Sequence, residues 1–469
     1  MAKSPTFDRY DTVVIGAGMS GLAAGIRLSQ AGGRVAVLER HSLWGGLNSF
    51  YKKNGRRWDV GLHALTNFVP KGQRGHPLSK VLRQLRVPYD ALQLGEQKGS
   101  RTVFPDAQLR FSNDFELLRS QVHEAFPAQA SGFDALAAAV AATPIGTGDD
   151  QASARAYLRT FVDDALLIDL LLHPLLWYGS PTPMDMDHAG FVVLWKSVYE
   201  EGFARPAGGM RPLLDVLRAR LADEGGELRT NCGVAAIVHG SHGVTGVQLE
   251  DGSELETQRV LSSAGWVETM ALSGTSSAAI EDEAGRISFV ECCAKLDTKP
   301  SDLGHDDTIV FYNLAPTTIY DVPATGHLEL RSGVLCCPDN YANQVPDPEG
   351  TARITVLASP RHWNGFDDAA YATAKQEAFD GAFQAVQSFA PNFLPHVTVR
   401  DAFTPRTITH FTGKRNGAVY GAPKKRPDGA TPIDGLHLIG TDQGLLGIVG
   451  AMMSGIQVAN HHVLAPTTS

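Results

Sequence analysis

Short apolar runs alternate with glycine-rich turns near both ends of the chain. Close to the N-terminus, Thr12–Ile15 is a run of apolar and β-branched residues, the pattern of a parallel strand that is buried on both faces. Small and apolar residues follow with helical spacing until a Gly-Gly turn at residues 32–33. Residues 34–38 repeat the apolar pattern, and Glu39 comes directly after them. The pattern predicts a strand, a helix and a second strand.

Two later segments show related patterns. The segment DGLHLIGTDQGLLGIVGAMMSGIQVAN, residues 434–460, begins as a strand, passes through a glycine-rich turn and continues as a helix from near Ile448. In the middle of the chain, a Gly-Gly pair at 208–209 precedes an amphipathic helix from about Pro212 and a strand near Ala235. Glycine turns of this kind allow a ligand or another backbone to approach closely.

A leucine-rich run, ALLIDLLLHPLLWY, occupies residues 165–178. It is too short to cross a bilayer and contains Asp169 and His173, so we predict no transmembrane helix. Residues 161–178, which include this run, and the apolar and aromatic segment 191–199 together suit an apolar tunnel for a substrate. The part 166–177 of the run is a candidate for a tunnel mouth that contacts a membrane, and a wholly buried core helix is the alternative.

The composition indicates a globular protein with a mild negative charge. Of 469 residues, 43% are apolar and 19% are charged, which is enough apolar surface for a large core. The 41 basic and 50 acidic residues give a net charge of -9, which argues against a large nucleic-acid-binding face. The five cysteines lack CxxC spacing, and their odd number fits a reducing compartment. We therefore expect no metal site and a cytoplasmic location.

The glycines after the first strand carry the strongest chemical signal. Gly16, Gly18 and Gly21 form a GxGxxG motif between the predicted strand and helix, with Glu39 at the end of the second strand. The first glycine makes the tight turn, the second lets the backbone approach a pyrophosphate, and the third lets helix and strand pack closely. Glu39 is placed to accept hydrogen bonds from ribose hydroxyls and would repel a 2′-phosphate. These residues predict a dinucleotide site but do not separate NAD from FAD.

The next motifs resemble one family. A Gly-Gly pair at 45–46 follows Glu39, and WDVGLHAL occupies residues 58–65. Here the chain resembles the FAD-dependent amine oxidase and phytoene desaturase superfamily, in which an acid, a short turn and Gly-Gly follow the first fingerprint. The DxGxH form, made by Asp59, Gly61 and His63, resembles the retinol saturase and carotenoid isomerase branch.

This resemblance implies a non-covalent FAD with binding residues from both ends of the chain. Asp442 would accept a hydrogen bond near the ribityl-pyrophosphate region, and the helix from near Ile448 would direct its first N–H groups to the pyrimidine edge of the flavin. In a flavin amine oxidase, a cysteine that binds flavin covalently would lie near the C-terminus, but the last cysteine here is Cys337, which lowers that alternative without removing it. The expected cofactor-binding residues are Gly16, Gly18, Ser20, Gly21, Glu39, Arg40, Gly45, Gly46, Gly61, Val234, Ala264, Gly440, Asp442, Gly447, Val449 and Gly450.

Two residues are candidates for catalysis at the flavin ring. His63 comes from the GLH loop, and Gln443 lies beside the final motif. A structural role for His63 is equally compatible with the sequence. The pair His461–His462 fits a partner of the helix C-terminus better than a metal site.

The resemblance implies an α/β fold. We expect a Rossmann-like FAD-binding domain of the glutathione-reductase-like, amine oxidase type, interleaved with an α+β substrate-binding domain. The FAD-binding domain is predicted to be discontinuous, and the substrate-binding domain to occupy the two intervening segments. The predicted segments are 8–75, 205–290 and 396–469 for the FAD-binding domain, and 76–204 and 291–395 for the substrate-binding domain.

The function implied is an FAD-dependent oxidoreductase that acts on carbon–carbon bonds of a carotenoid or a related isoprenoid polyene. Desaturation, saturation and cis–trans isomerisation stay open, each by hydride exchange with flavin N5. The alternatives are a flavin amine oxidase and a prenyl-group-binding protein of the same fold, such as the Rab GDP dissociation inhibitors. The expected partners are a lipophilic polyene and an external electron donor or acceptor, with peripheral membrane contact and no nucleic acid.

Overall fold

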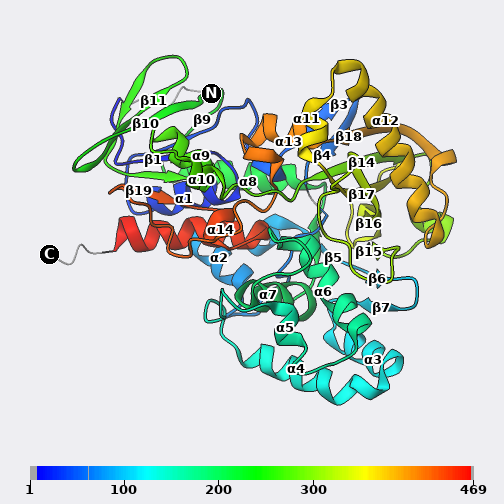
Figure 1. The fold of residues 1–469 in the computed structure, drawn as a ribbon. Coiled ribbons are helices and arrows are strands. Elements are labelled where there is room, and N and C mark those ends of the chain that lie inside the picture. The colour runs from blue at the N-terminus through cyan, green and yellow to red at the C-terminus, as the bar shows by residue number, and fades with distance from the viewer. Residues whose placement is uncertain (1–7, 62, 466–469) are drawn as a thin grey trace.

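The computed structural model describes residues 8–61 and 63–465, which fold around two sheets (Figure 1). The first sheet has five strands, and every neighbouring pair in it is parallel. The predicted strand–helix–strand unit lies at its centre. In spatial order the strands are β19 (Leu436–Leu438), β13 (Val260–Ser262), β1 (Thr12–Ile15), β2 (Val35–Leu38) and β9 (Glu227–Arg229).

This sheet is buried on both faces, as its apolar runs predict. Val14 packs into a core shared with four helices, whereas Val13 and Ile15 point into a second core beneath a three-stranded antiparallel sheet and a short helix. The four helices are α1 (Met19–Ser29), α2 (Pro77–Leu85), α8 (Met210–Asp223) and α14 (Gly447–Val458). The opposite layer consists of β10 (Val234–Gly240), β11 (Gly243–Leu249), β12 (Glu254–Glu256) and α9 (Trp266–Leu272).

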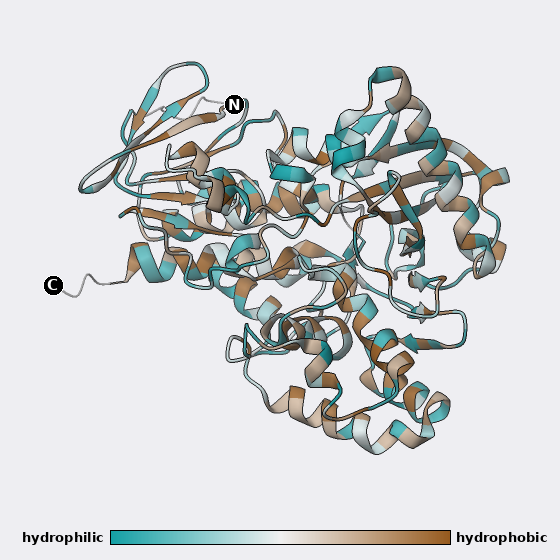
Figure 2. Cartoon of the chain, in the orientation of Figure 1, coloured by the Kyte–Doolittle hydropathy of each residue, from teal (hydrophilic) through white to brown (hydrophobic). Residues whose placement is uncertain are grey.

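The second sheet has seven strands and is antiparallel except where β15 pairs with β6. One face packs on α12 (Asp368–Ala385) and α11 (Pro360–Gly365), and the other faces a helical layer. Figure 2 shows hydrophobic residues along the central strands of both sheets. In spatial order the seven strands are β18 (Val397–Phe403), β14 (Phe289–Leu296), β17 (Gly350–Ala358), β16 (Leu328–Cys336), β15 (Ile309–Asn313), β6 (Ser100–Val103) and β7 (Gln108–Phe111).

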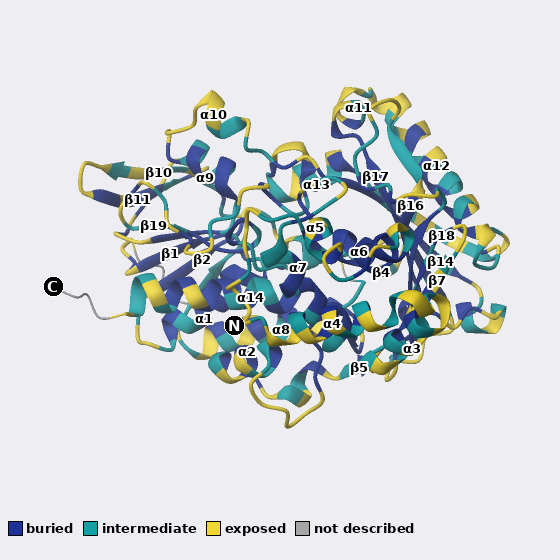
Figure 3. Ribbon diagram, turned by 60° about the horizontal axis from the view of Figure 1, so that its bottom comes forward, coloured by how far each residue is buried: buried dark blue, intermediate teal, exposed yellow. Residues whose placement is uncertain are grey.

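The leucine-rich run forms the buried helix α6 (Ala165–Gly179). Asp164 caps it by accepting hydrogen bonds from two backbone N–H groups, and its leucines from Leu167 onward are buried (Figure 3). The idea that 166–177 forms a membrane-facing mouth is therefore wrong, because the residues from Leu167 to Trp177 are buried inside the protein. Around it lie α3 (Phe115–Ala125), α4 (Ala130–Ala142), α5 (Ala154–Leu158) and α7 (His188–Trp195).

Across the described ranges 8–61 and 63–465, no helix is long and apolar enough to cross a membrane.

Short elements join the two sheets. The connecting elements are the hairpin of β3 (Phe50–Lys53) and β4 (Arg56–Asp59), the pair β5 (Leu94–Glu96) and β8 (Ala204–Pro206), and the helices α10 (Ala278–Glu281) and α13 (Pro405–Thr412).

The expected α/β fold is confirmed. The division into two discontinuous domains stays a prediction. Strand β18 lies inside the segment 396–469 and pairs with β14 of the seven-stranded sheet, so a division that follows the sheets would place it with the second sheet.

The last helix packs directly on the first. A Cβ atom at Gly455 of α14 would overlap the carbonyl oxygen of Ser20, which belongs to α1. Ser454 accepts a hydrogen bond from the backbone N–H of Gly440 at 2.6 Å, so the same helix also holds the turn that precedes it. The small residues of the C-terminal segment thus serve helix–helix contact as well as the turn.

We predict that Gly455→Ala destabilises the apoprotein by about 1–3 kcal/mol, because the added methyl meets rigid backbone rather than a movable side chain. The midpoint of urea unfolding of the apoprotein measures it. Gly365→Ala is the control, because a Cβ atom at that exposed helix end has no neighbour within 4 Å. Equal midpoints for the two variants would contradict the packing described.

Candidate active site

The carboxyl ends of the parallel strands open onto one large cavity, where open α/β sheets bind their ligands. Gly16 follows β1, Glu39 follows β2, Ser263 follows β13, and Gly440 lies just beyond β19. All four line a cavity of about 970 Å³ that continues to the inner face of the seven-stranded sheet. Segments from both ends of the chain therefore meet at one site.

Glu39 is held in place by backbone N–H groups. Its two carboxylate oxygens accept hydrogen bonds from Ala17 and His41, each at 3.0 Å. A carboxylate offers roughly four acceptor positions, so about two stay available for ribose hydroxyls. This arrangement fits the adenosine end of a dinucleotide.

The three fingerprint glycines have the separate roles that the motif predicts. Gly16 has φ +91°, a left-handed conformation that favours glycine, and a Cβ atom there would overlap Ser263. A Cβ atom at Gly21 would overlap the carbonyl oxygen of Gly16, so this glycine serves helix–strand packing. Gly18 has no neighbour within 4 Å in the direction of a Cβ atom and lines the cavity. The backbone is thus exposed where a pyrophosphate would lie.

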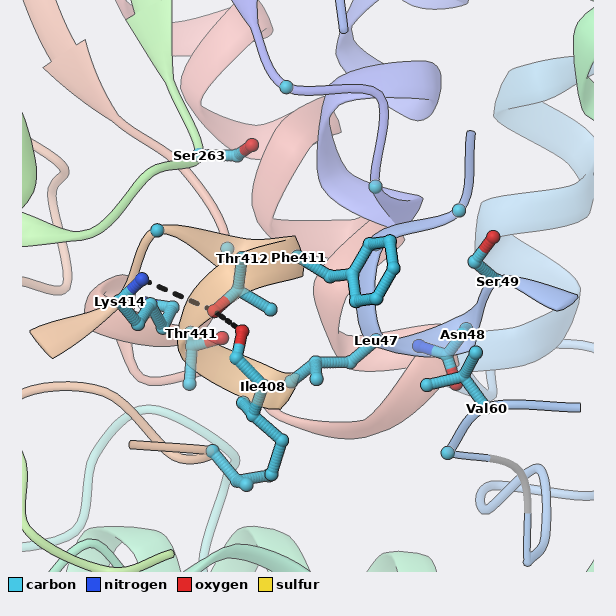
Figure 4. Close-up of a pocket in the computed structure, with 18 of the residues that line it drawn as sticks. Leu47, Asn48, Ser49, Val60, Ser263, Ile408, Phe411, Thr412, Lys414 and Thr441 are labelled. Carbon is cyan, nitrogen blue, oxygen red and sulfur yellow. Dashed lines mark hydrogen bonds between the residues drawn. The ribbon is translucent and has the colours of Figure 1, made fainter. Parts of the chain in front are cut away.

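The phosphate region contains a cation that the sequence did not single out. Among the described residues, no side chain caps the N-terminus of α1, so its N–H groups and positive dipole end are available to an anion. Lys414 is buried and lines the cavity near Ser263 and Thr441 (Figure 4). Lys414 lies outside the motifs described in the sequence, so none of them pointed to it.

The cavity brings together most of the expected cofactor-binding residues. Their contact with FAD itself stays a prediction. The residues that line the cavity are Gly16, Gly18, Ser20, Glu39, Arg40, Gly45, Gly46, Gly61, Val234, Ala264, Gly440 and Gly447. Those that do not line it are Gly21, Asp442, Val449 and Gly450.

Asp442 lies behind the lining. Its carboxylate accepts hydrogen bonds from the N–H groups of Trp266 at 2.6 Å and Ala422 at 2.9 Å. Burial raises the pKa of Asp442, but Lys414, Lys425 and the two N–H donors outweigh it, so the net pKa lies below its usual value. Asp442 therefore ties the final motif to the start of α9, and its expected hydrogen bond with the cofactor stays a prediction.

Gln443 lies away from the cavity. Its side-chain N–H donates to the carbonyl of Pro427 at 2.8 Å, and it lines a separate small hollow beside α14. Val449 is fully buried in the helical core, and Gly450 packs on Leu445. Helix periodicity points Val449 and Gly450 away from the cavity, whereas Gln443 lies in the turn before α14.

Aromatic side chains line the end of the cavity remote from Glu39. Trp177 stacks on Phe289 with ring centroids 5.1 Å apart, and Tyr178 lies 5.5 Å from Phe311. Tyr420 meets Phe289 edge-on and donates a hydrogen bond to the carbonyl of Trp177. We call these five residues the aromatic chamber. The expected apolar tunnel thus draws on α6, whereas the segment 191–199 does not line the cavity.

One polar cluster adjoins the chamber. His63 Nε2 lies 3.3 Å from Glu291 Oε1 and 3.1 Å from Thr355 Oγ1, and all three residues line the cavity. Arg353 Nε donates to Glu291 Oε1 at 2.5 Å. Burial raises the pKa of Glu291, but the charges of Arg353 and His63 bring it below its usual value. Glu291 and Arg353 come from strands in regions where the sequence carried no motif.

Comparison with known proteins agrees with this architecture. Residues 19–268 match the family described as flavin containing amine oxidoreductase. The chain belongs to that family. A prolycopene isomerase of Arabidopsis thaliana is 22% identical over 97% of this chain and 83% of its own. A neurosporene-forming phytoene desaturase of Rhodobacter capsulatus is 26% identical over 91% of this chain and 89% of its own.

A solved structure shows the same fold. An oxidoreductase from Methanosarcina mazei superimposes with a TM-score of 0.68 at 18% identity, over 95% of this chain and 99% of the other. Family membership identifies this chain as a flavin oxidoreductase with FAD as its cofactor. Its glycine cradle, the N-terminus of α1 and Glu39 fit that cofactor.

We predict that the purified protein carries FAD without a covalent bond. The only cysteine in the lining, among the residues that the structure describes, is Cys232, beside Val234. Acid precipitation should therefore release all yellow colour into the supernatant. Flavin that stays with the protein pellet would contradict the prediction.

We also predict that Glu39→Ala weakens FAD binding by about 1.5–3 kcal/mol, because ribose hydroxyls lose a charged acceptor. Titration of apoprotein with FAD, followed by flavin fluorescence, measures the dissociation constant. Glu254→Ala removes an exposed carboxylate from β12, outside the cavity, and serves as the control. Equal affinity of the two variants would exclude the role given to Glu39.

Proposed function

We propose that this flavoprotein acts on carbon–carbon bonds of a polyene of the carotenoid or related isoprenoid class. The observation that carries the proposal is the aromatic chamber, which belongs to the same cavity as the cofactor cradle. Aromatic and aliphatic walls suit a hydrocarbon that has no hydrogen-bonding groups. The two carotenoid-modifying relatives, similar over more than nine-tenths of this chain, support the same class.

The main alternative is oxidation of an amine. A bound ammonium group needs an acceptor or an anion to offset its desolvation. The carboxylates nearest the chamber are already compensated, Glu291 by Arg353 and Asp401 by Lys53 and Lys375. The family description names amine oxidoreductases, so an amine substrate stays the second candidate.

A prenyl-binding protein without redox chemistry is less favoured. Such a protein does not require a carboxylate at the end of β2 or a glycine turn at Gly16 for a cofactor. Both are present here together with the exposed N-terminus of α1. The complete cradle supports an enzyme.

Each part of the cavity has a task in the proposed reaction. FAD, when bound, supplies hydride exchange at N5. The aromatic chamber binds the polyene, excludes water and presents ring faces that stabilise positive charge developing on the chain. His63 is the candidate catalytic residue on the chamber wall. The proposal leaves out Gln443, because its side chain lies in another hollow.

The test offers the holoenzyme a cis-polyene and a shorter, less conjugated precursor, with oxidised and pre-reduced flavin in parallel. We expect turnover of at least one polyene, seen as a shift of its visible absorbance, and no oxidation of simple primary amines. Turnover with reduced flavin indicates saturation or isomerisation, and turnover only with oxidised flavin indicates desaturation. Amine oxidation without polyene turnover would transfer the assignment to the second candidate.

A polyene must reach this cavity from a lipid phase, so we propose peripheral membrane contact at the cavity rim. Leu43 and Phe411 are 37% and 55% exposed, and both line the cavity. The Phe411 ring lies 5.0 Å from that of His41, which also lines it. An apolar rim of this kind can insert into a bilayer surface.

We expect the protein to float with liposomes and the double variant Leu43→Ser/Phe411→Ser to float markedly less. Val345→Ser is the control, because Val345 is 60% exposed but lies outside the cavity lining. Flotation of the double variant at the level of the control would exclude this rim as the contact.

A further inference from the structure

Saturation or desaturation of a carbon–carbon bond moves one proton in addition to one hydride. The aromatic chamber consists of hydrocarbon surface and phenol groups, and burial raises the pKa of Tyr178 and Tyr420 above the usual tyrosine value. Neither phenol is a ready proton donor or acceptor near neutral pH. The group that moves the proton must therefore come from the polar cluster beside the chamber.

His63 is fixed at its ring and at its backbone. Nε2 is shared between the carboxylate of Glu291 and the hydroxyl of Thr355. The carbonyl oxygen of His63 accepts a hydrogen bond from the Tyr341 hydroxyl at 3.0 Å. Among the residues described in the structure, none forms a hydrogen bond with Nδ1, which is also absent from the set of fully buried, unpaired polar atoms. One ring nitrogen is therefore held, and the other is free on a residue that lines the cavity.

Arg353 secures the carboxylate behind the histidine. Its guanidinium is almost fully buried, binds Glu291 through Nε and donates to the carbonyl of Val60 at 2.5 Å. An ionised carboxylate can only accept, so it favours the tautomer with the proton on Nε2. The lone pair then lies on Nδ1 in the neutral ring, and the imidazolium form carries an N–H there.

We propose that Arg353, Glu291 and His63 form a proton relay in which Nδ1 of His63 exchanges a proton with a carbon of the bound polyene. This inference rests on the proposed function. Glu291 is a positioning residue, because it acts through His63. It favours the His63 tautomer with the proton on Nε2 and stabilises the positive charge of the imidazolium form. The arrangement follows the general rule that a carboxylate on one imidazole nitrogen orients the other for acid–base work.

The proton balance is simple in the reducing direction. Reduced FAD, when bound, would supply the hydride to one carbon of the double bond, and the electron pair of the π bond takes the proton from Nδ1. Two C–H bonds form, while the π bond, the flavin N–H bond that held the hydride and the Nδ1–H bond break, and neutral imidazole remains. An external two-electron donor would have to reduce the flavin again, and solvent returns the proton to the imidazole. Desaturation is the reverse and needs an external acceptor.

This relay favours a net redox reaction. Isomerisation by a hydride that is transferred from reduced flavin and then returned moves no net proton, so it does not require an imidazole held in this way.

Other titratable groups around the polar cluster leave the charge of the cluster unchanged. Burial raises the pKa of Cys336 to about 12, and burial also raises the pKa of Cys293 and Tyr341, so these three groups stay neutral. Asp59 lies near Arg353 and is itself paired with Arg205.

The first test measures the tautomer and needs no substrate. In the ¹⁵N NMR spectrum of histidine-labelled holoprotein at mildly alkaline pH, the signals that disappear in His63→Gln should show a protonated Nε2 and an unprotonated Nδ1. Glu291→Gln should lose this preference, and Glu291→Asp should retain it in part. A wild-type ring with its proton on Nδ1 would overturn the relay.

The second test uses turnover in D₂O. Wild-type enzyme should place solvent deuterium at one carbon of the saturated product, and His63→Gln should turn over about 10²–10⁴-fold more slowly while it still binds FAD. Glu291→Gln should also turn over more slowly, because the carboxylate no longer holds the imidazole proton on Nε2. If that variant fails to fold, His63→Gln alone decides. Wild-type rate and pH profile in His63→Gln would overturn the relay.

The outcomes separate the relay from the proposed function. If no polyene is turned over by wild-type enzyme, the proposed function fails, and the tautomer measurement still decides whether Glu291 orients His63. If polyenes are turned over and His63→Gln is unaffected, the function stands and the relay fails. Isomerisation without incorporation of deuterium would likewise support the function and contradict the relay.

Discussion

The whole site depends on backbone contact between the first helix and the last. Gly455 of α14 lies against Ser20 and Ala24 of α1 at a distance that no side chain could occupy. This contact places β19 beside β13 and brings the turn at Gly440 to the carboxyl edge of the sheet. The cofactor cavity is therefore completed only when residues more than four hundred positions apart have packed together. The glycines of the C-terminal segment serve this closure first.

A second contact joins motifs that appear unrelated along the chain. Asp59 of the DxGxH motif accepts hydrogen bonds from Arg205 and from the N–H of Met210 at the start of α8. A Cβ atom at Gly209 would overlap that carboxylate. The Gly-Gly pair before α8 thus makes room for an anionic cap at a helix N-terminus. The hairpin that precedes His63 in the chain ends at Asp59 and is held by the same contact.

The sequence was sufficient for the parts of the structure that depend on local geometry. The strand–helix–strand unit, Glu39 and the glycine cradle follow from short-range steric and hydrogen-bonding requirements, and the structure places them as expected. Orientation around α14 was not predictable, because it depends on which side of the helix packs on α1. Val449 therefore points away from the cavity. Gln443 and Asp442 lie in the turn before α14, where Gln443 donates to the carbonyl of Pro427 and Asp442 accepts from backbone N–H groups.

The polar cluster was beyond prediction for a different reason. Glu291 and Arg353 are alternating members of ordinary strands and become neighbours only through the antiparallel register of β14 and β17. A buried ion pair costs desolvation free energy and adds little stability over an apolar pair of similar size.

The position of this buried ion pair is therefore informative. The pair of Glu291 and Arg353 lies beside the aromatic chamber, whose other walls are apolar and aromatic. Glu291 contacts His63, which is the only histidine beside that chamber among the described residues that line the cavity. An apolar chamber binds a hydrocarbon without any charge. The charged residues beside the aromatic chamber are explained by the proton that must be transferred when a carbon–carbon bond is reduced or oxidised.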